Sequence, residues 1–356
     1  MKHFSFLFLS LAAVSGSAPA AVELVVGAPK TAAVSQPFSI DFDPKGVLHG
    51  VEFTQSNRVY RLVDGKVEFI AGVPHKADEK AGASEEVHDG ADPLKAVFKG
   101  MHDIQITRDG RALIGDSFHN RVRLLDLATG RVSTLAGTGK AGFSGDGGPA
   151  IAATFSVTMT AALSPDQKRF FIADIGNSRT RAVDLATGIV TTVAGNGKKG
   201  LPADDGNALE SPMGDTRAVT MARDGTLYVL LRGGNSLVAV KDGKARTVVN
   251  AAGKKGFSGD GGAARDATMN GPKYVAMDAD DNVLICDTEN HCVRRYLSKT
   301  GMIELIAGLP PKAGNKLGDT WLTTELDHPH GVRLGPDGKL YICDTYNNRV
   351  LRGEYR

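Results

Sequence analysis

Short hydrophobic runs recur along the whole chain and are separated by turn residues. One set of runs ends in Ala-Gly: VEFIAG, VSTLAG, VTTVAG, VVNAAG and IELIAG. A second set follows a tight hairpin turn: RDGRALIGD, PDQKRFFIAD, RDGTLYVLL, ADDNVLICD and PDGKLYICD. A third set begins at an Asp or Asn turn: DSFHNRVRLL, DIGNSRTRAV, DTENHCVRRY and DTYNNRVLRG. This pattern predicts an all-β chain built from repeated groups of strands.

The runs keep a fixed order, which we label as strands a to d. Four antiparallel strands with a period of roughly 40–65 residues are typical of a propeller blade. The predicted blades span 38–72, 101–137, 157–195, 216–253, 272–308 and 329–356, and the last one lacks strand d. The segment AVELVVG at 21–27 has the strand-d pattern and is expected to pair with Val350–Tyr355. The expected fold is a six-bladed β-propeller whose ring is closed by this N-terminal strand, leaving no open sheet edge.

The N-terminus has the pattern of an export signal. A basic start, an apolar run from Phe4 to Val14 and the sequence Ala18-Pro19-Ala20 predict a signal peptide over residues 1–20. The expected domain organisation is therefore this signal followed by a single propeller over 21–356. The apolar run is too short to span a bilayer, and no later segment is apolar enough. We expect an exported monomer, periplasmic or extracellular, without a transmembrane segment.

Charge and cysteine content exclude some classes of partner and site. The formal net charge is +2 and no block of Lys or Arg stands out, so nucleic acid is not an expected partner. Cys286, Cys292 and Cys343 form no CxxC pair, which disfavours a zinc knuckle or a thioredoxin motif. Cys286 and Cys292 flank a hairpin turn, so a disulfide between them and three small buried thiols both remain open.

The stretch Gly137–Gly142 matches G-x-G-x-x-G and leads into GFSGDGGPA. A dinucleotide site would need a βαβ unit around this motif, which is missing here. A near copy, GFSGDGGAA, recurs at 256–264, and both copies lie between blades. We interpret them as joints in which an Asp, such as Asp146, caps one short helical turn, and which border the channel mouth.

The joint pattern AGxGxxGFSGDGGxA, followed by a strand, PDG and a DTxNNRVR-like turn, resembles NHL-repeat proteins. Blades five and six match best, at CDTENHCVRR and CDTYNNRVLR, whereas blade four departs with Leu231 at the position of the turn Asp. The resemblance covers nearly all of 22–356 and implies a six-bladed propeller of the NHL/TolB-like kind. It implies little about function, because the family spans binding scaffolds and a few enzymes.

In a propeller, strand a lines the central channel. The first side chains of the six a strands are Phe38, His102, Met159, Arg217, Lys273 and His330. A purely structural core would favour small or apolar residues at these positions, yet most of them are cationic or can become so. Asp103 and Tyr274 follow directly. A concave, charged mouth is the default ligand site, so we predict that His102, Asp103, Arg217, Lys273, Tyr274 and His330 contact a ligand.

Two interpretations of the histidines compete. In the first, His102 and His330 form hydrogen bonds to backbone carbonyls and are structural residues of the rim of the mouth. In the second they form an acid–base pair or a weak metal site, with zinc or calcium as candidate ions. Their spacing around the ring is similar to that in peptidyl-hydroxyglycine amidating lyases, where the resemblance implies three zinc-binding histidines. Here Arg217 takes the third place, and a fixed cation there would repel a metal.

The sequence therefore leaves three functions open. The leading hypothesis is an exported propeller that binds an anionic small molecule, glycan or peptide through the Arg217, Lys273 and His330 cluster. The alternative is a lyase or a lactonase-type hydrolase with His102 or His330 as general base and Arg217 as a clamp. A second alternative is a scaffold that binds a protein partner on its outer faces.

Overall fold

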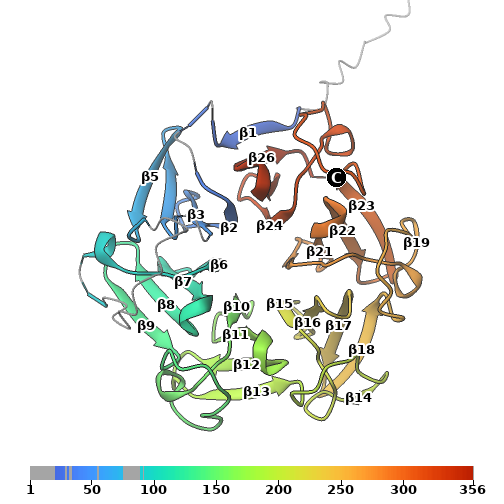
Figure 1. The fold of residues 1–356 in the computed structure, drawn as a ribbon, viewed down its shortest axis with the longest axis horizontal. Helices are drawn as coiled ribbons and strands as arrows, with labels where there is room; N and C mark the ends of the chain where they lie inside the picture. Colours follow the sequence, from blue (N-terminus) through green and yellow to red (C-terminus); the bar gives the residue numbers. More distant parts are fainter. Residues whose placement is uncertain are drawn as a thin grey trace, which may run out of the picture.

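In this computed structural model the chain forms six antiparallel sheets arranged in a ring around a central axis (Figure 1). The structure describes residues 21–28, 30–31, 34–53, 56–74, 89–90 and 92–355. The predicted signal peptide lies outside these described residues. The six sheets confirm the predicted all-β, six-bladed propeller. Within the described ranges, none of the helices has the length and hydropathy needed to cross a bilayer.

Each blade runs from an inner strand a to an outer strand d. Blade 1 contains β2 (Pro37–Phe42), β3 (Leu48–Glu52), β4 (Val59–Val63) and β5 (Lys66–Ala71). Blade 2 contains β6 (Met101–Ile106), β7 (Arg111–Asp116), β8 (Arg121–Asp126) and β9 (Val132–Ala136). Blade 3 contains β10 (Thr158–Leu163), β11 (Arg169–Asp174), β12 (Arg179–Asp184) and β13 (Val190–Ala194).

The other three blades follow the same order. Blade 4 contains β15 (Thr216–Met221), β16 (Leu227–Leu231), β17 (Ser236–Lys241) and β18 (Lys244–Val249), with β14 (Gly206–Asn207) on its outer edge. Blade 5 contains β20 (Tyr274–Met277), β21 (Val283–Asp287), β22 (Cys292–Leu297) and β23 (Met302–Gly308), with β19 (Gly262–Ala263) outside. Blade 6 contains β24 (Pro329–Leu334), β25 (Leu340–Asp344), β26 (Arg349–Gly353) and β1 (Glu23–Val26).

Strand β1 closes the ring as the sequence predicts. It pairs antiparallel with β26, Glu23 opposite Arg352 and Val26 opposite Val350. Nε of Arg352 donates a 2.8 Å hydrogen bond to a carboxylate oxygen of Glu23, and Val26 is fully buried. The two ends of the described chain thus share one sheet, which leaves blade 6 with four strands like its neighbours.

Among the described residues, the hydrophobic core is divided into six clusters, one between each pair of neighbouring blades. Phe171 of blade 3 packs in one cluster with Val229 of blade 4, and Leu113 of blade 2 packs with Phe170 of blade 3. Since both faces of every blade contact another blade, inner strands such as β16 are buried at every position. Burial on both faces explains why the sequences of these strands are continuous apolar runs rather than alternating apolar and polar residues.

A polar clasp joins consecutive blades at the turn between strands b and c. Asn120 adopts φ 53°, and its Oδ1 accepts a 2.8 Å bond from the backbone N–H of Val157 in the next blade. Its carbonyl oxygen lies against Gly137, where an added Cβ would sit 2.3 Å from that oxygen. Gly137 has φ 95°. The same close approach at the end of other d strands explains the repeated Ala-Gly ending.

The glycine-rich joints lie on the perimeter rather than at the mouth, which corrects the sequence expectation. Asp146 caps no helix: its Oδ1 accepts a 2.8 Å bond from Arg181, and its Oδ2 accepts a 2.7 Å bond from Thr192. Asp260 pairs with Arg294 in the same way. Because these arginines are fully buried on β12 and β22, the joint aspartates neutralise them from outside the blade. A joint Asp is thus part of an ion pair between distant segments, which no local capping rule reveals.

Short 3-10 helices occupy two kinds of position. Four lie in the joints: η1 (Pro93–Lys95), η3 (Ala150–Ala152), η5 (Ala264–Asp266) and η7 (Trp321–Thr323). Four more form turns between strands b and c: η2 (Ser117–His119), η4 (Ile175–Asn177), η6 (Thr288–Asn290) and η8 (Thr345–Asn347). The predicted helical turn is therefore present in these joints, while the described joint between blades 3 and 4 has β14 instead.

The three cysteines are free and buried. Cys286 lies opposite Val293 and Cys292 opposite Asp287, so the two thiols that flank the hairpin are not cross-strand partners. The interpretation of three small buried residues is confirmed. Burial raises the pKa of the Cys286 and Cys292 thiols well above their usual value.

Candidate functional site

Six side chains from the start of the inner strands gather at one end of the channel. We call them the mouth ring: Phe38, His102, Met159, Arg217, Lys273 and His330. In five of the six blades the mouth-ring residue lies at a β-bulge, where the pairing of strands a and b skips a position. In a regular strand this side chain would point into one face of the blade. A bulge changes its direction. The repeated bulge is the local reason that these side chains converge on the channel.

The two histidines of the mouth ring are fixed by backbone carbonyls. Nδ1 of His102 lies 2.8 Å from the carbonyl oxygen of Gly100, and Nδ1 of His330 lies 2.7 Å from that of His328. A carbonyl only accepts, so Nδ1 carries the proton and Nε2 is left as the acceptor. The contact with backbone carbonyls expected from the sequence is present, and it orients both Nε2 atoms.

Both imidazoles are held in the neutral form. Burial is the main cause that lowers the pKa of His102 and of His330 well below the usual value, and the charges of Arg217 and Lys273 lower both further. His102, His330, Arg217 and Lys273 thus lie close enough to influence one another electrostatically. Blades 2, 4 and 6 therefore contribute His102, Arg217 and His330 to one cluster. This is the alternation around the ring that the sequence predicts.

Arg217 is a buried cation without a carboxylate partner among the described residues. Its side chain is 6% exposed, one terminal nitrogen contacts the sulfur of Met159, and Nε has no hydrogen-bond partner. Burial, aided by Arg232, lowers the pKa of Arg217 to about 9. By contrast, the buried Arg181 pairs with both Asp146 and Asp174. Arg217 therefore lacks the compensation that the buried arginines within the blades receive.

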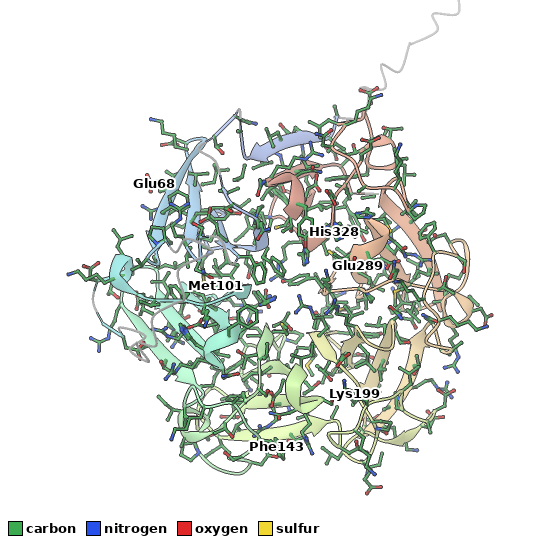
Figure 2. All side chains as sticks on the ribbon, in the orientation of Figure 1. Glu68, Met101, Phe143, Lys199, Glu289 and His328 are labelled. Atoms are coloured by element: carbon green, nitrogen blue, oxygen red, sulfur yellow. The ribbon has the colours of Figure 1, made fainter. Side chains whose placement is uncertain are left out.

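Lys273 begins a chain of charged groups across blades 5 and 6. Its Nζ lies 2.8 Å from Glu289, whose second oxygen lies 3.2 Å from Nε2 of His328. Nδ1 of His328 lies 2.6 Å from Asp327. Figure 2 labels Glu289 and His328 beside each other on the inner side of these blades. Burial lowers the pKa of Lys273, with Glu289 opposing this effect, so the lysine is the paired cation of the mouth.

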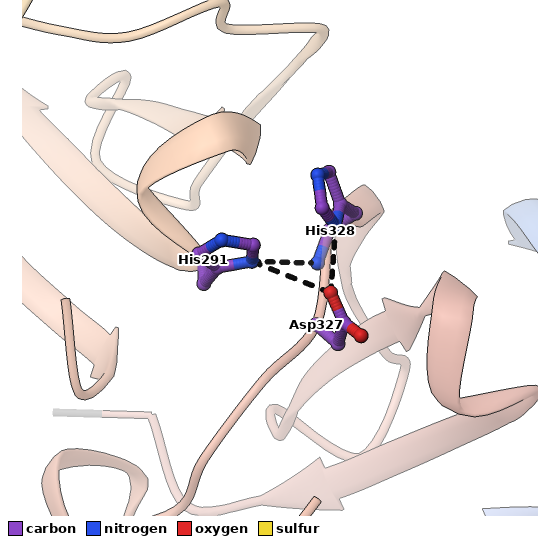
Figure 3. Close-up of side chains that lie close together, drawn as sticks. All are labelled: His291, Asp327 and His328. Carbon is purple, nitrogen blue, oxygen red and sulfur yellow. Dashed lines mark hydrogen bonds and ion pairs between the residues drawn. The ribbon is translucent and has the colours of Figure 1, made fainter. Parts of the chain in front are cut away.

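His291, Asp327 and His328 form a cluster with potential metal-ligand atoms (Figure 3). Its three residues belong to no motif that the sequence predicts as a site. Nδ1 of His291 accepts a 3.2 Å bond from the backbone N–H of His328. The turn asparagines, such as Asn120, make this same clasp with the following blade. The lone pair that a metal would need on this nitrogen is already used, so the cluster is better described as a histidine version of the clasp.

The mouth histidines do not fit a three-histidine zinc site either. Phe38, from the blade between theirs, packs against both rings with centroid distances of 4.8 Å to His102 and 4.0 Å to His330. The third position holds Arg217, a cation. Zinc sites need three or four anionic or neutral donors that converge on one point.

Asp103 and Tyr274 lie next to the mouth ring but are committed to protein partners. The Tyr274 hydroxyl donates a 2.9 Å bond to Asp103, and Ser39 donates another at 2.8 Å. The backbone N–H of Ala161 donates to the second carboxylate oxygen at 3.1 Å. Burial raises the pKa of Asp103 despite the nearby charge of Arg333. Their polar atoms are thus occupied, whereas Nε of Arg217 has no hydrogen-bond partner.

Comparison with protein families decides the identity of the repeat. The model of the NHL repeat matches residues 269–296 and 326–352, which cover strands a to c of blades 5 and 6. The chain is an NHL-repeat β-propeller. The curated relatives include SUPPRESSOR OF QUENCHING 1 of Arabidopsis thaliana, a chloroplastic protein, at 27% identity over 73% of this chain. NHL repeat-containing protein 2 of Gallus gallus is 24% identical over 74% of this chain. This NHL propeller spans 25% and 39% of the length of those two proteins.

Solved structures share the propeller fold. An auxiliary nutrient binding protein from Bacteroides ovatus aligns with a TM-score of 0.66 and 15% identity, over 94% of this chain and 76% of that one. Its counterpart from Bacteroides thetaiotaomicron gives 0.64 and 14%, over 90% and 69%. A virginiamycin B lyase from Staphylococcus aureus gives 0.53 and 12%, over 94% and 99%. At these identities the likeness concerns the fold alone.

Sequence reasoning missed a second layer of residues at the mouth of this NHL propeller. They lie in the b–c turns, one or two positions after the turn carboxylate or its replacement: Phe53, Phe118, Arg232, Glu289 and Tyr346. Phe118 contacts His102, and Arg232 acts electrostatically on Arg217. Alignment of the blades on the turn carboxylate would have revealed them, because these two positions vary between blades while the flanking residues repeat.

Proposed function

We propose that this protein is an exported NHL-repeat propeller that binds an anionic small molecule, glycan or peptide at the mouth ring. The observation that carries the proposal is Arg217, which is buried without a carboxylate partner among the described residues. Burying a charge without a partner costs several kcal/mol. A ligand carboxylate or phosphate would supply the missing partner, and a guanidinium can bind either one through two parallel hydrogen bonds.

The rest of the mouth is compatible with this role. Lys273 adds a second cation, although Glu289 already shares its charge. The Nε2 atoms of His102 and His330 are oriented acceptors for ligand hydroxyl or amide groups. The propeller fold shared with nutrient-binding proteins of Bacteroides supports a small-molecule site, and the signal-like residues 1–20 support export.

The test is a calorimetric titration of the protein with acetate, phosphate, glucuronate and a short acidic peptide. Arg217→Gln should weaken the ligand that binds best by roughly 10- to 100-fold, because a charged hydrogen bond contributes about 1.5–3 kcal/mol. Arg246→Gln is the matched control, since Arg246 is exposed and paired with Asp205. Equal affinity in Arg217→Gln and the wild type would place the anion site elsewhere.

One observation favours a second candidate function, a lyase or lactonase-type hydrolase. A neutral histidine with a fixed Nδ1 proton and an open Nε2 can act as a general base, and His102 and His330 both meet that condition. Ligands that bind in the calorimeter would be incubated with the protein and followed by mass spectrometry. Turnover that is lost in His330→Gln or His102→Gln while binding persists would support the enzyme. Unchanged ligand mass would support binding alone.

A further inference from the structure

Aromatic rings form a continuous arc around one side of the mouth, from blade 6 through blade 1 to blade 2. The ring centroid of Tyr346 lies 6.0 Å from that of His330, and the His330 ring packs against Phe38. Phe38 and Phe53 both contact His102, and their own centroids are 4.5 Å apart. The arc continues to Phe118, whose ring centroid lies 5.7 Å from that of His102. We call these six rings the aromatic arc: Tyr346, His330, Phe38, Phe53, His102 and Phe118.

The opposite side of the mouth is cationic. Arg217 and Arg232 come from blade 4 and Lys273 from blade 5. The inner strands β15 and β20 are neighbours in the ring, so Arg217 and Lys273 occupy adjacent mouth-ring positions, and both arginines lower the pKa of Lys273. Blade 3, between the cations and the aromatic arc, presents Gly176 at the turn position where blade 2 has Phe118. The mouth is therefore divided into an aromatic half and a half that holds three cations and one carboxylate, Glu289, which pairs with Lys273.

The ends of the aromatic arc are open to solvent. Phe118 is 41% exposed and Tyr346 is 50% exposed, whereas Phe38 between them is buried. Both exposed rings occupy the same turn position of their blades, two residues after the buried carboxylates Asp116 and Asp344. Folding of the blade does not require an aromatic residue there, because blades 3 and 4 have Gly176 and Gly233. Each ring is covered on one side, Phe118 by Gly100 and Tyr346 by His328 at a centroid distance of 4.3 Å, and its exposed part is available to a ligand.

Resting on the anion-binding function proposed above, we infer that the ligand carries a flat aromatic ring next to its anionic group. The anion would pair with Arg217, and the ring would lie on the aromatic arc, in edge-to-face or offset-stacked contact with Phe118 or Tyr346. Aromatic pairs of this kind contribute about 0.5–1.5 kcal/mol beyond the burial of apolar area. Apolar walls with a few well-placed polar groups are also the usual composition of small-molecule sites.

The test compares phenylacetate with cyclohexylacetate by calorimetry. The two acids have the same charge and similar size, and only the first has a flat aromatic ring. Phenylacetate should bind roughly two- to tenfold more tightly. Phe118→Leu and Tyr346→Leu should each reduce this preference, while Arg217→Gln should weaken both acids alike. The matched control is Phe143→Leu, because Phe143 is 44% exposed but lies on a perimeter joint, 3.9 Å from the Arg179 guanidinium.

The outcomes separate this inference from the function on which it rests. If both acids bind with equal affinity and both depend on Arg217, the anion site stands and the aromatic preference is wrong. The same conclusion follows if Phe118→Leu and Tyr346→Leu change the preference no more than Phe143→Leu does. If neither acid binds and the other anions also fail, both proposals are wrong. Thermal melting of each variant verifies folding, which substitution of an exposed ring should not disturb.

Discussion

The guanidinium of Arg217 contacts the thioether of Met159 and, among the described residues, no carboxylate. Thioether sulfur is a weak acceptor, so this contact does not offset the loss of hydration. Arg217 should therefore lower the stability of the ligand-free protein. Arg217→Met should raise the free energy of unfolding by about 1–3 kcal/mol and remove anion binding. Urea denaturation followed by circular dichroism measures the change.

Arg181→Met is the comparison for that prediction. Arg181 is equally buried but pairs with Asp146 and Asp174, so its removal leaves carboxylates without a partner. It should destabilise the protein by roughly 3–5 kcal/mol. A loss of stability in Arg217→Met similar to that in Arg181→Met would mean that Arg217 is a structural residue of the fold.

The mouth histidines should make the protein less stable in mild acid. Their pKa values are lower in the folded state than in the unfolded chain, whose value is near 6.5. As the pH falls below this value, the unfolded chain binds protons at these histidines and the folded state does not. The free energy of unfolding therefore falls. The slope is about 1.4 kcal/mol per pH unit for each histidine.

The double variant His102→Gln, His330→Gln isolates this contribution. His49 and His291 also have lowered pKa values and are retained in both proteins, so their effect cancels in the comparison. Denaturation curves between pH 7 and pH 5 should show a shallower dependence in the double variant. Parallel curves would indicate that both imidazoles can be protonated inside the folded mouth.

Ring closure by β1 should control cooperative unfolding. Val25 and Val26 are buried between β26 and the adjacent blade. Removal of residues 21–27 deletes these buried side chains and exposes the edge of β26 and the apolar residues that packed on β1, which should cost roughly 3–6 kcal/mol in apolar burial alone. Calorimetry should show a lower melting temperature and a broader transition. Glu23→Gln, which removes only an exposed ion pair, should change stability by less than about 1 kcal/mol, and an unchanged melt after the deletion would contradict the closure.

The clasp at His291 should tolerate asparagine. Asn57, Asn120, Asn235 and Asn348 make the same bond to the following blade at 2.7–2.8 Å, whereas the His291 bond is 3.2 Å. His291→Asn should therefore preserve or slightly raise stability. His291→Ala should cost about 1–2 kcal/mol, because it leaves the backbone N–H of His328 without its acceptor. If His291→Asn were as damaging as His291→Ala, the histidine would have a role beyond the clasp.

Most of the fold could be predicted because each blade is encoded locally. Glycine at the end of strand d, the Asp-Gly hairpins and the Asx turns determine strand limits within a few residues, and the repeat then gives the number of blades. The closing role of 21–27 was predictable for the same reason, since that segment carries the strand-d pattern. The mouth ring was found by aligning repeats, although the sequence gives no sign that a bulge turns His102 or Arg217 toward the channel.

The predictions that failed depend on partners distant in sequence. Asp146 has the local features of a helix cap, but the tertiary structure brings it to Arg181, whose buried charge attracts it more strongly than a short helix end. The Cys286 and Cys292 thiols flank one hairpin, and only the strand register shows that they do not face each other. Phe118 and Tyr346 belong to turns whose residues differ between blades, so the repeated sequence pattern does not reveal them.

By itself, the sequence determined the secondary structure, the number of blades and the closure of the ring, because those properties arise from short-range patterns repeated many times. Tertiary structure alone decided which charges are compensated. Arg181 and Arg217 are both arginines on propeller strands, yet one pairs with two carboxylates and the other contacts a thioether and is repelled by two further cations. Electrostatic compensation depends on distances between segments far apart in the chain, and those distances exist only once the ring has closed.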